Sequence, residues 1–235
     1  MMYVINHKEK YIIFMYPKSG CSTLRVLHAY LAHPEAVGET YFEDRHHGIQ
    51  RRDDETITKH LDQYKDYHKI LVYREPCERV ASLFFQKVCG VPAVSVKGKL
   101  YEEPVRLHVD MRTFKEFVDV LVTGRFDHDE HFQPQKIPMP LREFDQVLEL
   151  SSIDRLFINT RPDLHATVNR ILVRKSNWNE LTKVRPDIPY ADYDFHTDLE
   201  GWLVRREVPT YDAVLTQAIC RKLSTEYGDD FLTGI

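Results

Sequence analysis

Two uninterrupted apolar runs, each followed by a loop and a helical pattern, constrain the fold of this chain most strongly. Residues 11–16 read Tyr-Ile-Ile-Phe-Met-Tyr and precede Pro17. In residues 69–73, Lys69 is followed by the apolar run Ile-Leu-Val-Tyr, which precedes Arg74. Apolar runs without alternation are typical of strands that are buried on both faces, as in a parallel sheet. The repeated order of strand, loop and helix therefore predicts an α/β fold.

The helical patterns support the same fold class. Apolar residues recur at helical spacing after Thr23 until Pro34 ends the pattern, and a second pattern covers residues 78–88 with Pro76 in the first turn. Alternating strands and helices predict a mostly parallel central sheet with helices flanking both faces in three layers. Further expected elements are a strand at 146–150 and helices at 55–64, 113–122, 161–172 and 211–227.

The size of the chain predicts a single domain over residues 1–235, because α/β domains commonly reach this length. An apolar fraction of 43% is sufficient for a packed core. Gly90, Pro92, Gly98 and Pro104 interrupt any regular pattern, so we expect an irregular flap over a site at about residues 90–112.

Charge and hydropathy exclude several classes of partner. The net charge is −4, from 32 basic and 36 acidic side chains, which argues against nucleic acid or an anionic membrane as a partner. Polar residues interrupt the first 15 positions and no run of about 18 apolar residues occurs, so we expect a cytoplasmic location. The four cysteines form no C-x-x-C pair, which predicts reduced thiols and no zinc site.

The loop after the first apolar run is the first candidate site. Pro17-Lys18-Ser19-Gly20-Cys21-Ser22-Thr23 lies where a buried strand turns into a helix, so backbone N–H groups and the helix dipole converge there. Gly20 permits close approach, Lys18 adds positive charge, and Ser22 and Thr23 add hydroxyl donors. These features predict a phosphate site. It is not a Walker A loop, because Lys18 precedes Gly20.

The second candidate site follows the second apolar run. Residues 73–82 read Tyr-Arg-Glu-Pro-Cys-Glu-Arg-Val-Ala-Ser, and Arg74 together with Ser82 would hold a second phosphate. The alternative is that Glu78 and Arg79 are solvated helix charges and that Ser82 has no role.

These two segments resemble the 5′-phosphosulfate loop, P-K-x-G-[CT]-[ST], and the 3′-phosphate signature, R-x-P-x-x-R-x-x-S, of sulfotransferases that use 3′-phosphoadenosine-5′-phosphosulfate (PAPS). Residues 129–135, Asp-Glu-His-Phe-Gln-Pro-Gln, are similar to the segment D-x-H-[WF]-x-P-Q, which lines the acceptor side in that family. The likeness is greatest to the carbohydrate branch and its soluble microbial relatives. Phe132 stands where Trp is usual, and Cys77 where a bulky aromatic is frequent.

The resemblance implies a P-loop-like fold and a donor site. Lys18 would contact the phosphosulfate bridge, and Arg74 with Ser82 would bind the 3′-phosphate. The reaction would be in-line transfer of a sulfuryl group to a hydroxyl, with adenosine 3′,5′-bisphosphate as product and no metal required. The 5′-phosphate would be cradled by Ser19, Gly20, Cys21, Ser22 and Thr23.

The general base that deprotonates the acceptor has three candidates. His131 lies in the third segment, His47 lies between the two phosphate motifs, and Glu130 adjoins His131. A metal site formed by Asp127, His128 and His131 is a weaker alternative, because the loop lacks helical H-x-x-x-H spacing.

Two other functions stay open. An ATP-dependent small-molecule kinase would need a Walker-type Gly-Lys and a carboxylate at a strand end to hold Mg²⁺, and a non-catalytic nucleotide-binding protein would need only the loops. The acceptor is expected to be a glycan or a small hydroxyl compound, with specificity in residues 35–66 and 90–112. The sequence leaves the oligomeric state open.

Overall fold

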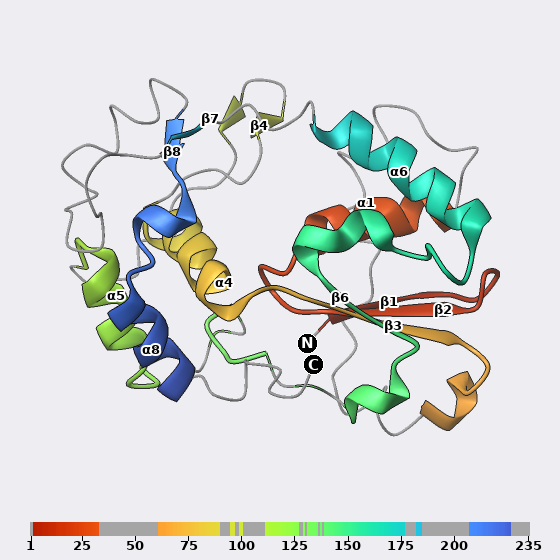
Figure 1. Ribbon diagram of the computed structural model, residues 1–235, viewed down its shortest axis with the longest axis horizontal. Helices are drawn as coiled ribbons and strands as arrows, with labels where there is room; N and C mark the ends of the chain where they lie inside the picture. Colours follow the sequence, from red (N-terminus) through yellow and green to blue (C-terminus); the bar gives the residue numbers. More distant parts are fainter. Residues whose placement is uncertain are drawn as a thin grey trace. The chain divides into compact units, whose positions relative to one another are not determined.

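The computed structural model describes residues 2–32, 61–89, 95–96, 99–100, 111–126, 129, 131–135, 137, 139–176, 182–184 and 207–226. The chain forms two compact units (Figure 1). The first consists of Met1–Arg74 and Gln135–Val173, and the second of Glu75–Pro134 and Arg174–Ile235. The single domain expected over residues 1–235 stays a prediction.

The first unit is built on a four-stranded sheet in the order β1-β2-β3-β6. The strands are β1 (Met2–Asn6), β2 (Tyr11–Met15), β3 (His68–Tyr73) and β6 (Gln146–Glu149). The pairs β2–β3 and β3–β6 are parallel, and β1 is antiparallel to β2. The expected α/β fold with a mostly parallel sheet and flanking helices is confirmed. Strand β1 was not predicted, because its apolar run, Met2 to Ile5, is short and is followed by the polar residues Asn6 to Lys10.

Helices cover one face of this sheet. Helices α1 (Cys21–Ala32) and α6 (Pro162–Ser176) lie on the same side of it (Figure 1). Ile13 and Met15 of β2 point to that face and pack with Leu24 and Leu27 of α1. Every residue of β2 is buried, as a strand covered on both faces must be.

On the opposite face of the sheet, Ile12 and Phe14 pack against Phe144 and Met139. Two short 3₁₀ helices, η2 (Leu61–Tyr64) and η4 (Leu141–Glu143), contribute partly buried residues to this cluster. Burial of each large apolar side chain contributes about 1.5–3 kcal/mol, so the two clusters together hold the strands in place.

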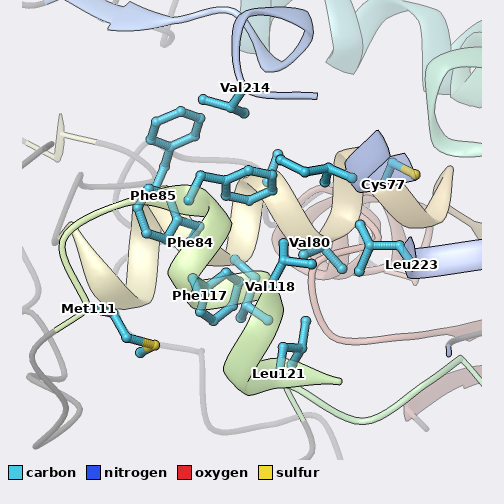
Figure 2. Packing of buried hydrophobic residues seen from close by; sticks show 14 of the residues in the cluster. Cys77, Val80, Phe84, Phe85, Met111, Phe117, Val118, Leu121, Val214 and Leu223 are labelled. Carbon is cyan, nitrogen blue, oxygen red and sulfur yellow. The ribbon is translucent and has the colours of Figure 1, made fainter. Parts of the chain in front are cut away.

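The second unit has a helical core. It contains α4 (Pro76–Leu83), α5 (Phe114–Leu121) and α8 (Gln217–Glu226), and their buried side chains form one cluster, which Figure 2 shows around Phe84 and Phe117. The ring centroids of Phe84 and Phe117 are 5.4 Å apart. A capping box at Thr113 and Glu116 begins α5.

Two predicted helices of this unit differ from the structure. The helix expected at 78–88 is α-helical only to Leu83 and continues as a π-helical turn, η3 (Phe84–Val88). The helix expected at 211–227 begins as a 3₁₀ turn, η6 (Tyr211–Ala213), before α8. Phe84 and Phe85, the first two residues of the π turn, are both buried.

Two short strand pairs also lie among the described residues. β4 (Ser95–Val96) and β5 (Lys99–Leu100) are antiparallel, and β7 (Thr182–Val184) and β8 (Glu207–Pro209) are parallel. Most of the predicted flap at 90–112 lies outside the described residues. In the described part of the chain, no helix is long and apolar enough to cross a membrane.

Candidate functional site

The carboxyl ends of β2 and β3 carry the two phosphate motifs. The paired positions Met15 and Val72, and Tyr73 and Glu149, bring the ends of β2, β3 and β6 to one edge of the sheet. Pockets for anionic ligands form at this edge in open α/β sheets, because strands end there and helices begin.

The loop after β2 begins with a tight turn. The Ser19 N–H donates to the Tyr16 carbonyl at 3.0 Å, with Pro17 at the second position and Lys18 at the third with a φ of 69°. This is the pattern of a type II turn, in which Lys18 takes the left-handed conformation that glycine adopts more readily. A residue with a side chain is strained there by about 1–2 kcal/mol. Strain of this kind clusters at binding sites.

A thiol reinforces the turn. The Cys21 Sγ–H donates to the same Tyr16 carbonyl at 2.7 Å, so one oxygen accepts from two residues of the loop. A hydroxyl at this position would make the same contact, which explains why Cys or Thr satisfies the motif.

Gly20 joins the turn to the helix. Its φ is 79°, and a Cβ there would collide with Cδ1 of Leu150, the first residue of η5 (Leu150–Arg155). Its carbonyl accepts from the Leu24 N–H at 2.9 Å, which begins the hydrogen bonding of α1. The positive φ therefore favours glycine at this position, and the end of the Leu150 side chain would have to shift to admit a Cβ.

The loops after β2 and β3 are tied together inside the first unit. Arg74 donates from Nη1 to the Lys18 carbonyl at 3.2 Å. The buried side chain of Gln135 contacts both loops, because it accepts from Ser19 Oγ at 2.8 Å and from the Arg74 N–H at 3.3 Å. Sequence reasoning included Gln135 in the third motif but did not assign it to the donor site.

Most of the predicted donor residues thus meet at one edge. Lys18, Ser19, Gly20, Cys21 and Arg74 lie in or beside these two loops. The half-buried Thr23 lies in the first turn of α1; Ser22 belongs to the same turn, and its side chain is outside the described residues. Ser82 lies on α4 in the second unit, where its phosphate-binding role stays a prediction.

Asp129 and His131 form a pair in the second unit. The Asp129 Oδ1 accepts from the His131 backbone N–H at 2.9 Å and from the His131 ring Nδ1 at 2.7 Å. Because a carboxylate oxygen only accepts, Nδ1 carries a proton, and the other ring nitrogen, Nε2, is not part of this pair. Burial by itself would raise the pKa of Asp129. The hydrogen bonds and charge of His131, with the charge of Lys87, outweigh burial and hold that pKa below its ordinary value.

Arg79 holds the backbone of the same segment. It is 0% exposed, and its Nη1 and Nη2 donate to the carbonyls of His131 and Gln133 at 3.2 and 2.9 Å. The alternative in which Arg79 is a solvated helix charge is therefore wrong. Arg79, the second arginine of the 3′-phosphate signature, holds the backbone of residues 131–133. The spacing of charged residues along a helix does not predict such a role.

The other two candidate bases, His47 and Glu130, lie outside the described residues. Asp127 and His128 of the alternative metal site also lie outside them. In the part of the chain that the structure describes, no group of three or more His, Cys, Asp or Glu is placed to hold a metal ion.

Glu149 is a site feature that the sequence analysis missed. It ends β6 opposite Tyr73 of β3, and it is half-buried. Burial and the Glu149 carboxylate together raise the pKa of Tyr73. A carboxylate at a strand end is one of the two features that the kinase alternative requires, whereas the Walker-type Gly-Lys is absent from the loop.

The fold and these loops define a class, namely an α/β protein with a tight turn between strand and helix at the carboxyl edge of its parallel strands, where proteins of this fold class bind their ligands. The model of the sulfotransferase family matches residues 1–145, a stretch that contains all three motifs. The chain belongs to the sulfotransferase family. No match was found among curated proteins or among solved structures. The predicted class of enzyme, a transferase of sulfuryl groups, is thereby confirmed, and the carbohydrate branch stays a prediction.

Proposed function

We propose that this protein transfers the sulfuryl group of PAPS to a hydroxyl acceptor and releases adenosine 3′,5′-bisphosphate. The observation that carries the proposal is the hydrogen bonding of Arg74 to the Lys18 carbonyl and of Ser19 to Gln135, which links the two loops expected to bind phosphate. A nucleotide with phosphates at both its 3′ and 5′ positions suits two such loops, and the family membership supports a sulfuryl donor.

The donor loop supplies charge to the leaving group. As the bond between sulfur and the bridging oxygen breaks, negative charge develops on the 5′-phosphate. Lys18 and the backbone N–H groups from Gly20 onward neutralise this charge, while the Ser19 N–H donates to the Tyr16 carbonyl and holds the turn. Arg74 and Ser82 bind the 3′-phosphate. Groups held in place in this way provide the in-line geometry that sulfuryl transfer requires.

For the general base we propose His131. Its Nδ1 donates to Asp129, which leaves Nε2 to accept the proton of the acceptor hydroxyl as the oxygen attacks sulfur. His47 and Glu130 stay the alternatives that the sequence offers. We propose a carbohydrate hydroxyl as the acceptor, on the likeness of the motifs to that branch of the family.

Calorimetric titration of the protein with adenosine 3′,5′-bisphosphate tests the donor site. We expect Arg74→Ala to weaken binding of the bisphosphate about tenfold or more, because a charge-assisted hydrogen bond contributes about 1.5–3 kcal/mol. Adenosine 5′-phosphate should bind the variant nearly as well as it binds the wild type, since it lacks the 3′-phosphate.

The matched control is Arg142→Ala, which removes an exposed arginine of η4 in the same unit. It should bind the bisphosphate as the wild type does. Unchanged affinity in Arg74→Ala would remove Arg74 from the site. Preference of the wild type for ATP with Mg²⁺ would favour the kinase alternative and would draw attention to Glu149.

A further inference from the structure

We infer that Gln135 is a positioning residue of the donor site, whose amide sets the separation of the two phosphate-binding loops. This inference rests on the proposed nucleotide site. The sequence places Gln135 in the acceptor-side motif, but its side chain makes its contacts with the loops after β2 and β3.

Three hydrogen bonds define the role of the amide. Gln135 Oε1 accepts from Ser19 Oγ at 2.8 Å and from the Arg74 N–H at 3.3 Å, and Gln135 Nε2 donates to the Arg74 carbonyl at 3.1 Å. A carbonyl oxygen has two lone pairs, so one acceptor serves both loops. Gln135 is 2% exposed and Ser19 is 0% exposed, so water does not readily replace these bonds.

The two bonds to Arg74 act on the main chain rather than on the guanidinium. Strand β3 ends at Tyr73, and the amide of Gln135 pairs with the next N–H and carbonyl much as a neighbouring strand would. The guanidinium of Arg74 is then directed to the Lys18 carbonyl. The orientation of Arg74 thus depends on a side chain 61 residues away in sequence.

Other side chains fail to reproduce this arrangement. Asparagine is one methylene shorter and does not span both loops. Glutamate keeps the two acceptor contacts, but its carboxylate has no N–H to donate and repels the Arg74 carbonyl. Methionine has nearly the same shape and makes none of the three hydrogen bonds.

The consequence concerns ligands that carry two phosphates. A bisphosphate gains its affinity by engaging both loops at once, which requires them to be held at the right separation. A nucleotide with a single phosphate needs only one loop. Loss of Gln135 should therefore reduce the preference for adenosine 3′,5′-bisphosphate over adenosine 5′-phosphate, and not merely lower stability.

Gln146 provides the matched control. It is also a glutamine of the first unit that bridges two backbone groups, because its Nε2 donates to the Arg155 carbonyl at 3.1 Å and its Oε1 accepts from the Phe157 N–H at 3.3 Å. It contacts neither phosphate loop through these bonds. Gln146→Met therefore removes a comparable set of hydrogen bonds from the same unit.

The experiment is to measure the dissociation constants of both nucleotides for the wild type, Gln135→Met and Gln146→Met in the full chain. We expect the preference for the bisphosphate to fall at least tenfold in Gln135→Met and to change less than twofold in Gln146→Met. Gln135→Glu provides the same comparison if Gln135→Met does not fold, and its preference should also fall.

The outcomes separate this inference from the proposed function. A wild type that prefers the bisphosphate, with the preference kept in the Gln135 variants, overturns the role of Gln135 and leaves the donor site standing. Loss of preference in both Gln135→Met and Gln146→Met would also overturn it, because the effect would then follow from general destabilisation. A wild type without the preference overturns both proposals.

Discussion

At the scale of single residues, the carboxylate of Asp129 determines what His131 can do. It accepts from both the backbone N–H and the ring of the histidine, which orients the imidazole and fixes the tautomer. A base held in this way loses little freedom when it meets the acceptor. Asp129 is thus part of the proposed catalytic pair although it does not itself contact the acceptor.

The variant Asp129→Asn tests this pair. We expect kcat to fall about tenfold or more while affinity for adenosine 3′,5′-bisphosphate stays unchanged, because the imidazole loses its charged orienting partner. Asp119→Asn, which removes an exposed carboxylate of α5 in the same unit, should keep its kcat. Equal kcat in the wild type and Asp129→Asn would remove His131 from first place among the candidate bases.

The same variant makes a prediction about pH. The pKa of Asp129 is depressed in the folded protein, so its stabilising contribution is present above the ordinary value of about 3.9 and is lost as pH falls through the lower folded value. Asp129→Asn should therefore be less stable than the wild type at pH 6, and the difference should shrink below about pH 4. Urea unfolding at the two pH values measures this difference.

At the scale of elements, α4 positions the His131 segment through Arg79. The guanidinium extends from the buried side of α4 to two carbonyls of that segment, so the helix and the loop are linked by charge-assisted hydrogen bonds. The helix itself is well defined, because Glu75 caps its start and Pro76 occupies its first turn.

Arg79→Lys should therefore be strongly destabilising for a conservative change. Lysine has a single ammonium that does not reach both carbonyls with good geometry, so we expect a loss of about 1–3 kcal/mol in the free energy of unfolding. Arg221→Lys, on the exposed face of α8 in the same unit, should change it by less than about 0.5 kcal/mol. Equal unfolding midpoints for the two variants would contradict the role of Arg79.

At the scale of the whole molecule, the first unit is assembled from two separate stretches of chain. Residues 1–74 supply the loop after β2 and Arg74 at the end of β3, and residues 135–173 supply Gln135, β6 and most of α6. The part of the proposed donor site that contains Lys18, Arg74 and Gln135 therefore forms only when this unit has folded, and its ligand should stabilise the folded state.

This linkage predicts a thermal shift. Adenosine 3′,5′-bisphosphate at 100 times its Kd should add about 2.7 kcal/mol to the free energy of unfolding, which corresponds to about 5–10 °C in Tm for a chain of this length. Adenosine 5′-phosphate at the same concentration should give a smaller shift. A larger shift with ATP and Mg²⁺ would contradict the proposed donor. Differential scanning fluorimetry is sufficient for the comparison.

The sequence by itself determined the local features. The apolar runs at 11–16 and 69–73 predict buried parallel strands, because a strand that is buried on both faces has apolar residues at consecutive positions of the sequence. The residues at 17–23 predict an anion site because they are consecutive and lie between a strand and a helix. Arg74 can be assigned in the same way, because it directly follows the second predicted strand. These predictions required no knowledge of distant contacts.

Only the tertiary structure decided the contacts between distant residues. Gln135 lies 116 residues from Ser19, and Arg79 lies 52 residues from His131. A polar residue has the same identity whether it is solvated or buried, so its sequence neighbours do not reveal its partner. Burial and register arise only when the strands pair and the loops meet, and these placements decide which polar residues hold the site together.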